Sequence, residues 1–237
     1  MPNSYFKFKQ FTINQDKCAM KVCTDACIFG AWFSHKIPQN GLVLDIGAGT
    51  GLLMMMLAQR SQSEIHGFEI DPAAYSQCQE NISQNGWQER LTVFQGDARD
   101  VQAPVKYDFI ISNPPFFESD LHSASDQEKI AKHSTHLTLD ELIRVIASNL
   151  KTDGSFGILL PYHRRDYFNK LATQQNFSLQ EELIVKQSPG HTPFRSILQY
   201  SRNKCDFATT RHLTIQEIDR VYTPEFVELL KDYYLYL

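Results

Sequence analysis

The tetrapeptide Asn113-Pro114-Pro115-Phe116 carries the residues best suited to chemistry. It follows an apolar run, residues 107–112, that is typical of a strand. Two consecutive prolines fix the backbone and lack N–H donors, so the carbonyl groups beside them are held in place. The Asn113 side-chain oxygen and the Pro114 carbonyl can both accept from one –NH2 group, and the Phe116 ring offers a face for a planar base. Such an arrangement can hold an amino nitrogen in one orientation, so any catalysis at that nitrogen would come mainly from orientation. A rigid turn without a chemical role is the alternative.

A glycine-rich turn lies upstream, where Asp45 begins the pattern D-x-G-x-G-x-G with Gly47, Gly49 and Gly51. An apolar run typical of a buried strand precedes the turn, and a run typical of a helix follows it. Such a turn brings bare backbone N–H groups close to a ligand. The spacing differs from the G-x-G-x-x-G of dinucleotide-binding proteins. It resembles motif I of the class I S-adenosylmethionine-dependent methyltransferases; a structural tight turn in another α/β protein is the alternative.

Further carboxylates follow the next predicted strands. Ligands of open α/β sheets bind beyond the carboxyl ends of the strands. Glu69 is expected to accept both ribose hydroxyls, in preference to Asp71, which precedes Pro72 and suits a helix N-cap. The resemblance implies that Asp97 accepts from the adenine amino group and that Asp45 fixes the methionine amino group. For Asp97 a simple turn cap is the alternative.

The elements that must position these residues alternate between strand and helix. We expect strands at residues 42–46, 64–70, 91–95, 107–112 and 155–160, and helices at residues 52–58, 72–85, 138–150 and 164–175. Residues 118–137 are polar and predict a long loop. The alternation predicts an α/β fold, Rossmann-like, with a mostly parallel, doubly wound sheet.

The two ends of the chain depart from this alternation. Residues 179–187 and 194–201 leave no room for a helix between them, so they predict an antiparallel C-terminal hairpin. Two more elements are expected towards the C-terminus: a short or edge strand at residues 212–218 and an aromatic-rich helix at residues 223–236. At the other end, residues 6–13 predict a short strand or hairpin arm, and residues 25–33 predict a helix with Thr24 as N-cap. We expect one domain over residues 1–237, with residues 1–36 as an N-terminal arm and helix over the cofactor site and residues 37–237 as the core.

Charge and cysteine content narrow the class of protein. The formal net charge of −4 argues against a general nucleic-acid coat, and residues 64–141 hold 14 Asp+Glu against 5 Lys+Arg. A polyanion could therefore approach along the two ends of the chain. The five cysteines form no C-x-x-C pair and fit no common zinc pattern, so we expect no metal site. The sequence shows no membrane span and no signal peptide, and reduced thiols fit a cytoplasmic protein.

A closer resemblance runs over nearly the whole chain. The segment FKQFTINQDKCAMKVCTDACIFGAWF, residues 8–33, with LDIGAGTGLL, IISNPPF and the final YYLYL, resembles the bacterial tRNA1(Val) (adenine-37-N6)-methyltransferases. The resemblance implies S-adenosylmethionine as cofactor and adenine 37, beside the anticodon of tRNA, as substrate. It also implies that the N-terminal segment packs over the cofactor, so Lys21, Thr24 and Asp25 become candidate cofactor-side residues. Helix capping and surface charge are the alternative for these three. Cys23 stands where relatives often have glycine.

Contacts with RNA are expected from Arg164, Arg165, His191 and Arg195, for each of which simple solvent exposure is an equal alternative. The NPPF motif resembles motif IV of the amino-methyltransferases, which implies an amino group as the methyl acceptor and leaves open which molecule carries it. An rRNA guanine N2 enzyme and a protein glutamine N5 enzyme are the nearest alternatives. A cofactor-binding regulator without catalytic activity is a further alternative. For the oligomeric state, we favour a monomer.

Overall fold

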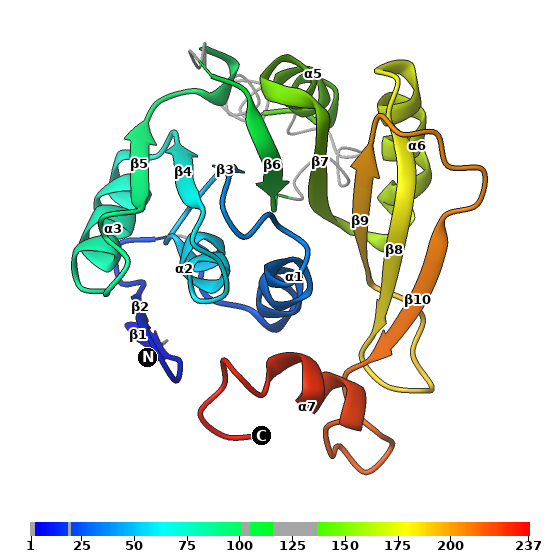
Figure 1. Cartoon of the computed structure of the whole chain (residues 1–237). Coiled ribbons are helices and arrows are strands. Elements are labelled where there is room, and N and C mark those ends of the chain that lie inside the picture. The colour runs from blue at the N-terminus through cyan, green and yellow to red at the C-terminus, as the bar shows by residue number, and fades with distance from the viewer. Residues whose placement is uncertain (1–2, 19, 101–104, 116–136) are drawn as a thin grey trace, which may run out of the picture.

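Eight strands of the described chain form one sheet, in the order β10-β8-β9-β7-β6-β3-β4-β5 (Figure 1). The structure is a computed structural model that describes residues 3–18, 20–100, 105–115 and 137–237. Every pair of neighbouring strands in the sheet is parallel except the two that involve β9. The strands are β3 (Leu42–Ile46), β4 (Glu64–Glu69), β5 (Leu91–Gln95), β6 (Tyr107–Ser112), β7 (Leu150–Pro161), β8 (Ser178–Lys186), β9 (Arg195–Ser201) and β10 (Thr209–Thr214).

Helices cover both faces of this sheet. One face carries α1 (Thr24–Ser34), α2 (Leu52–Ala58), α3 (Pro72–Ser83) and α7 (Pro224–Leu230). The other face carries α5 (Leu139–Asn149) and α6 (Arg165–Gln174). The described residues also form the short 3-10 turns η1 (Ala98–Asp100) and η3 (Tyr162–Arg164). The predicted Rossmann-like, mostly parallel, doubly wound sheet is confirmed, and so is the antiparallel hairpin of β8 and β9.

The first helix is held close to the sheet. A Cβ added at Gly157 in β7 would lie 2.5 Å from the ring of Phe33, so only glycine admits this contact. The chain passes from the end of α1 into the start of β3, so α1 runs opposite to the strands. Its first turn therefore lies at the carboxyl edge of the sheet, where parallel α/β folds bind ligands.

The N-terminal hairpin and the C-terminal segment lie at the same end of the molecule (Figure 1). Strands β1 (Tyr5–Lys7) and β2 (Thr12–Asn14) pair antiparallel, which confirms the predicted hairpin arm. Phe8 forms an antiparallel bridge with Tyr234. The backbone N–H of Lys9 donates to the carbonyl of Tyr233 over 2.8 Å.

Several predicted elements differ from the structure. The helix expected at residues 223–236 ends at Leu230. Beyond it, Asp232 pairs with Arg60 in the turn that follows α2, and Tyr234 forms a bridge with Phe8 of the N-terminal hairpin. Thr24 is the first residue of α1 and not its N-cap, which is Cys23. The strand expected at residues 155–160 extends over Leu150–Pro161.

Other boundaries shift less. The edge strand expected at residues 212–218 is β10, which ends at Thr214 and pairs parallel with β8. The helix predicted at residues 72–85 ends at Ser83. The loop predicted at residues 118–137 lies outside the described residues, apart from residue 137. Within the described ranges, no helix combines the length and apolar character that a bilayer crossing needs.

Candidate active site

The glycine turn joins β3 to α2 at the carboxyl edge of the sheet. Gly47, Gly49 and Gly51 have φ angles of 79°, 55° and 81°, a region that favours glycine. A Cβ added at Gly47 or Gly49 would meet no atom within 4 Å, so both face open space. A Cβ added at Gly51 would lie 2.8 Å from the Cys78 sulfur, so this glycine lets the turn pack on α3. The turn therefore presents backbone without side chains to a space that a ligand can enter. Its N–H groups are less available than predicted, because those of Gly47 and Ala48 donate to the carbonyl of Phe68 and that of Gly51 donates to the carbonyl of Ala48.

Asp45 lies beneath this turn and is fully buried. Neither of its carboxylate oxygens has a hydrogen-bond partner in the described part of the chain. Burial, and next the negative charge of Glu69, raise the pKa of Asp45 to about 8. Buried polar groups in folded proteins nearly always have a partner. An unpartnered buried carboxylate at a strand end therefore fits a site for a cationic or hydrogen-bonding ligand.

Asn113 lies at the end of the adjacent strand, β6. Ser112 pairs with Ile46 of β3, so Asn113 follows directly beside the glycine turn. Its side-chain oxygen is buried and, among the described residues, has no hydrogen-bond partner. Pro114 is buried and Pro115 is half-buried, which keeps this acceptor on a stiff backbone. Phe116, the predicted stacking residue, lies outside the described residues.

Glu69 ends β4 and is held in one orientation by two backbone donors. Its Oε2 accepts from the N–H of Gly49 over 2.8 Å, and its Oε1 accepts from the N–H of Asp71 over 2.9 Å. A carboxylate has about four acceptor positions, so these bonds leave capacity for a ligand. Asp71 accepts from the N–H of Ala73 over 3.1 Å, which confirms the prediction that it caps α3.

Asp97 follows β5 at the same edge. Its Oδ1 accepts from the backbone N–H of Arg99 over 2.8 Å and from the guanidinium Nε over 2.9 Å. The side-chain hydrogen bond from Arg99 is the main reason why the pKa of Asp97 lies below its usual range. This geometry is the turn cap that the sequence analysis kept as an alternative. A contact with adenine stays a prediction.

The segment before α1 reaches the same edge. Burial, and next the charges of Glu69 and Asp71, raise the pKa of Cys18 to about 11, so Cys18 lies close to the end of β4. The amine of Lys21 donates to the backbone carbonyl of Gln15. Thr24 lies in the first turn of α1, next to the hydroxyl of Tyr234. The predicted N-terminal arm is therefore near the carboxyl edge, and ligand contacts of Lys21 and Thr24 stay predictions.

Three of the four predicted RNA-contact residues lie beside aromatic rings. Arg165 lies over the ring of Tyr162 at 4.3 Å, Arg164 over Tyr167 at 4.8 Å, and Arg195 over Phe194 at 5.3 Å. They come from η3, the start of α6 and the start of β9, and they lie near one another because η3 follows β7 and Pro161 of β7 pairs with Arg195.

Predicted RNA-contact residues also have polar partners in the protein. Arg165 Nε donates to Asp166 over 3.3 Å, and another of its nitrogens lies 3.6 Å from Glu182. His191 Nδ1 lies 2.6 Å from the hydroxyl of Ser188. Arg195 Nε donates to Asp25 over 2.7 Å, so this guanidinium also joins β9 to α1. Arg195 therefore has a structural partner whether or not it contacts RNA.

One buried residue at this site was missed by the sequence analysis. Asn81 in α3 is fully buried and donates to the carbonyl of Thr50 in the glycine turn over 2.9 Å. A signal was present, because Asn81 shares the helix face of Ala74 and Cys78, which are apolar and buried. A polar residue in such a stripe needs a hydrogen-bond partner.

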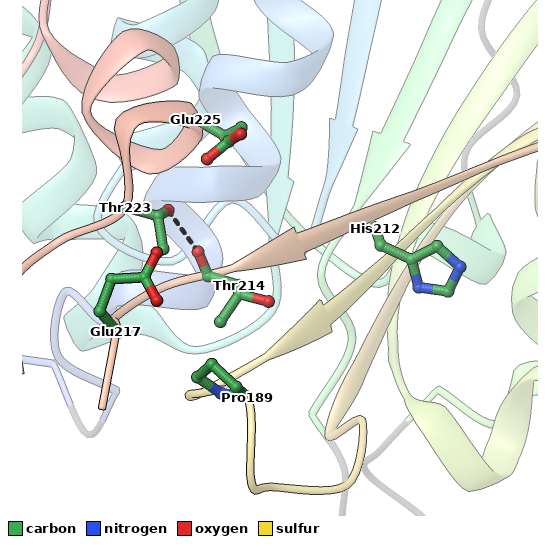
Figure 2. Close-up of a pocket in the computed structure, with 6 residues that line it drawn as sticks. All are labelled: Pro189, His212, Thr214, Glu217, Thr223 and Glu225. Atoms are coloured by element: carbon green, nitrogen blue, oxygen red, sulfur yellow. Dashed lines mark hydrogen bonds between the residues drawn. The ribbon is translucent and has the colours of Figure 1, made fainter.

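A hollow of about 230 Å³ lies elsewhere, near the end of β10. Its lining residues are Pro189, His212, Thr214, Glu217, Thr223 and Glu225 (Figure 2). Thr223 uses its hydroxyl to donate to the carbonyl of Thr214 over 2.6 Å. Strand β10 is four positions from β6 in the sheet, or roughly 19 Å at the usual strand spacing. The hollow is thus separate from Asp45 and Asn113.

No group of three or more metal-binding side chains gathers in the described ranges.

Comparisons with known proteins agree with this arrangement. Residues 31–172 match the family model of the methyltransferase small domain. The tRNA1(Val) (adenine(37)-N6)-methyltransferase of Dyadobacter fermentans is 40% identical, with 98% of each chain covered. The protein of the same name from Bacteroides thetaiotaomicron is 38% identical, with 100% of each chain covered.

Solved structures that resemble the chain share its fold at low identity. A protein of Agrobacterium tumefaciens, named a predicted O-methyltransferase, has a TM-score of 0.68 and 16% identity, covering 87% of this chain and 95% of its own. The tRNA m1G37 methyltransferase of M. jannaschii has a TM-score of 0.62 and 18% identity, covering 86% of this chain and 59% of its own. With the sequence relatives at nearly full length, the chain belongs to the family of the tRNA1(Val) (adenine(37)-N6)-methyltransferases.

Proposed function

We propose that this protein transfers a methyl group from S-adenosylmethionine to N6 of adenine 37 in tRNA1(Val). The curated relatives carry this activity in their names. The observation that supports it most directly is the pair of buried, unpartnered acceptors, Asp45 and Asn113, at the ends of neighbouring strands. One suits a cationic cofactor and the other an amino group of a substrate.

The residues around the glycine turn fit S-adenosylmethionine. Asp45 would accept from the methionine amino group, which provides the partner that its buried oxygens lack. Open space beside Gly47 and Gly49 gives the cofactor access to the backbone. Glu69 would use its remaining acceptor capacity for the ribose hydroxyls. When bound, the cofactor supplies a methyl group on a positively charged sulfur.

Three further residues are proposed at the two ends of the cofactor. Asp97 would accept from the adenine amino group beside its bonds with Arg99. Lys21 and Thr24, in the segment before and within α1, would face the methionine end. Gly51 contributes indirectly, because it lets the turn pack on α3.

Catalysis would come from orientation of the nucleophile. Asn113 Oδ1 and the Pro114 carbonyl would accept the two N–H groups of the target amine and so direct its lone pair. Pro115 stiffens the backbone, and Phe116 would stack on the base. No strong base is required, because the amine proton becomes acidic once the nitrogen carries the new bond.

The RNA would approach beside the end of β7. Arg164, Arg165, His191 and Arg195 are proposed to contact phosphate or base, and an anticodon-loop adenine is already easy to splay out. A tRNA substrate implies a cytoplasmic protein. One domain and a monomeric state remain part of the proposal.

The test uses purified protein, methyl-labelled S-adenosylmethionine and an unmodified tRNA1(Val) transcript, followed by nucleoside mass spectrometry. We expect N6-methyladenosine in this transcript and none in a matched transcript that carries guanine at position 37. Label in 2-methylguanosine of rRNA, or in a glutamine side chain of a protein fraction, would replace the proposed substrate by one of the two alternatives. Absence of cofactor binding would overturn the proposal as a whole.

A further inference from the structure

The side chain of Asn81 joins two segments that are distant in sequence. Its Oδ1 accepts from the backbone N–H of Asn14 over 2.9 Å, and its Nδ2 donates to the backbone carbonyl of Asn14 over 2.9 Å. The same Nδ2 donates to the carbonyl of Thr50 over 2.9 Å. Asn14 ends β2 of the N-terminal hairpin, and Thr50 lies between two glycines of the turn. One buried amide therefore holds both the hairpin and the turn.

Only an amide side chain satisfies all three partners. The pair of bonds with Asn14 requires a donor and an acceptor in one plane, as in a strand pair. The bond to Thr50 uses the second N–H of the same amide. A carboxylate would lose both donations, and an apolar side chain would lose all three bonds. Because Asn81 is fully buried, water does not readily replace these bonds.

The glycine turn is fixed from two sides. The N–H of Gly49 donates to Glu69, and the carbonyl of Thr50 accepts from Asn81. Gly51 lies against the sulfur of Cys78, so the turn rests directly on α3. Peptide groups are planar, so fixing the carbonyl of Thr50 also orients the N–H of Gly51, which donates to the carbonyl of Ala48 across the turn over 2.8 Å. The backbone path of the turn over which a cofactor would lie thus depends on Asn81.

We propose that Asn81 is a positioning residue that makes the N-terminal hairpin part of the support of the cofactor site. Docking of Asn14 fixes the Asn81 amide, and the amide fixes the carbonyl of Thr50 and the backbone of the glycine turn. This inference rests on the proposed function, because it takes the glycine turn as the place where the cofactor binds.

Gln77 offers a matched control on the same helix. It is also fully buried, and its Oε1 accepts from the backbone N–H of Lys17 over 3.0 Å. Its Nε2 lies 3.3 Å from Glu80. Gln77 therefore anchors the N-terminal arm as Asn81 does, but its bonds go to the arm and to its own helix. Loss of Gln77 loosens the arm without removing the bond to Thr50.

The experiment compares Asn81→Ala, Asn81→Asp and Gln77→Ala with the wild-type protein. Calorimetry gives the Kd for S-adenosylmethionine, steady-state assays give KM and kcat, and amide hydrogen exchange of the cofactor-free protein follows residues 49–52. For both Asn81 variants we expect Kd and KM for the cofactor to rise about tenfold, with kcat at saturation within about twofold of wild type. Exchange at residues 49–52 should become at least about fivefold faster. Gln77→Ala should keep the Kd within about twofold of wild type. Its melting temperature should fall about as far as that of Asn81→Ala.

The outcomes separate the inference from the proposed function. Equal rises in Kd for Asn81→Ala and Gln77→Ala would overturn the inference, because arm docking alone would then explain both. An unchanged Kd and unchanged exchange in Asn81→Ala would overturn it as well. If the wild-type protein binds no cofactor, the proposed function fails, and the exchange rates of the cofactor-free variants still decide whether Asn81 holds the turn. Should Asn81→Asp fail to fold with a buried charge, Asn81→Ala carries the comparison.

Discussion

Arg195 Nε donates to Asp25 Oδ2 over 2.7 Å, which ties the first residue of β9 to the first turn of α1. The two side chains are 24% and 11% exposed, so the pair is largely shielded from water. A second nitrogen of Arg195 donates to the carbonyl of Phe194 over 3.1 Å. Since α1 begins at the carboxyl edge of the sheet, this pair fixes its start beside the candidate active site.

This pair predicts a loss of stability when one partner is neutralised. Asp25→Asn preserves the shape of the side chain and its bond to the N–H of Ala26 but removes the charge opposite Arg195. We expect a fall of about 1–3 kcal/mol in the free energy of unfolding, below the value for a fully buried pair because both groups are partly exposed. Urea denaturation of Asp25→Asn, Arg195→Gln and the double variant measures the coupling. If the losses in the free energy of unfolding of the two single variants simply add in the double variant, the pair contributes no coupling energy. That result would contradict a structural role for Arg195.

Asp45 predicts a pH-dependent stability. Its folded pKa of about 8 lies well above the ordinary value for an unfolded chain, about 3.9. Between these values the folded protein binds more protons than the unfolded chain, so this group makes stability fall as pH rises, by at most about 1.4 kcal/mol per pH unit. Asp45→Asn cannot ionise and should lose this slope. In urea denaturation without cofactor at pH 5, 6 and 7, the free energy of unfolding of Asp45→Asn should rise relative to that of the wild type as pH rises. Parallel curves would contradict the prediction.

The same group predicts proton release when the cofactor binds. A cationic amino group stabilises the ionised form of Asp45, so a site that is protonated before binding loses its proton on binding. At pH 6.5 the release should approach one proton for each S-adenosylmethionine bound. Calorimetry in two buffers with different ionisation enthalpies measures this number directly. Asp45→Asn should release no proton and bind at least about tenfold more weakly; equal release in both proteins would assign the proton to another group.

Asn113 predicts a separation of turnover from cofactor binding. Its side-chain oxygen is proposed to hold the target amine, so Asn113→Ala should lower kcat by at least about 100-fold through lost orientation. The Kd for S-adenosylmethionine should stay within about threefold of wild type. Asn113→Asp retains an acceptor at this position and should recover part of the activity. Unchanged methyl transfer by Asn113→Ala would remove Asn113 from the proposed mechanism.

The parts of the site that the sequence predicted are those set by local pattern. Alternating strands and helices place Asp45, Glu69, Asp97 and Asn113 at successive strand ends, and the structure has these four at one edge of the sheet. Each of the four lies within two residues of the end of its strand, so the topology alone brings the residues together.

The parts that could not be predicted depend on partners far apart in the chain. Asp25 meets Arg195 across 170 residues, and Asn81 meets Asn14 across 67. No periodicity within one element encodes such pairs. The helix expected up to residue 236 fails for the same reason, because contacts of Asp232 and Tyr234 with other segments override the helical pattern after Leu230.

The C-terminal segment contains two tyrosines whose replacement should affect the free energy of unfolding to different extents. The ring of Tyr234 lies 5.7 Å from that of Phe6 and 6.0 Å from that of Phe8, and its hydroxyl lies against Thr24 and Cys27 of α1. Tyr234→Ala should therefore lower the free energy of unfolding by about 2–3 kcal/mol through lost aromatic packing. Tyr236 is 88% exposed, so Tyr236→Ala should change the free energy of unfolding by less than about 0.5 kcal/mol.

Tyr234→Phe isolates the hydroxyl from the ring. It preserves the aromatic packing and removes only the contact with Thr24 and Cys27, so a loss of about 1 kcal/mol is expected. Urea denaturation of the three variants under one condition provides the comparison. Equal losses for Tyr234→Ala and Tyr236→Ala would show that the C-terminal segment does not hold the hairpin against α1. Since Thr24 is proposed to face the methionine end of the cofactor, a Tyr234→Phe variant that keeps its stability but binds S-adenosylmethionine more weakly would place the hydroxyl in the support of that site.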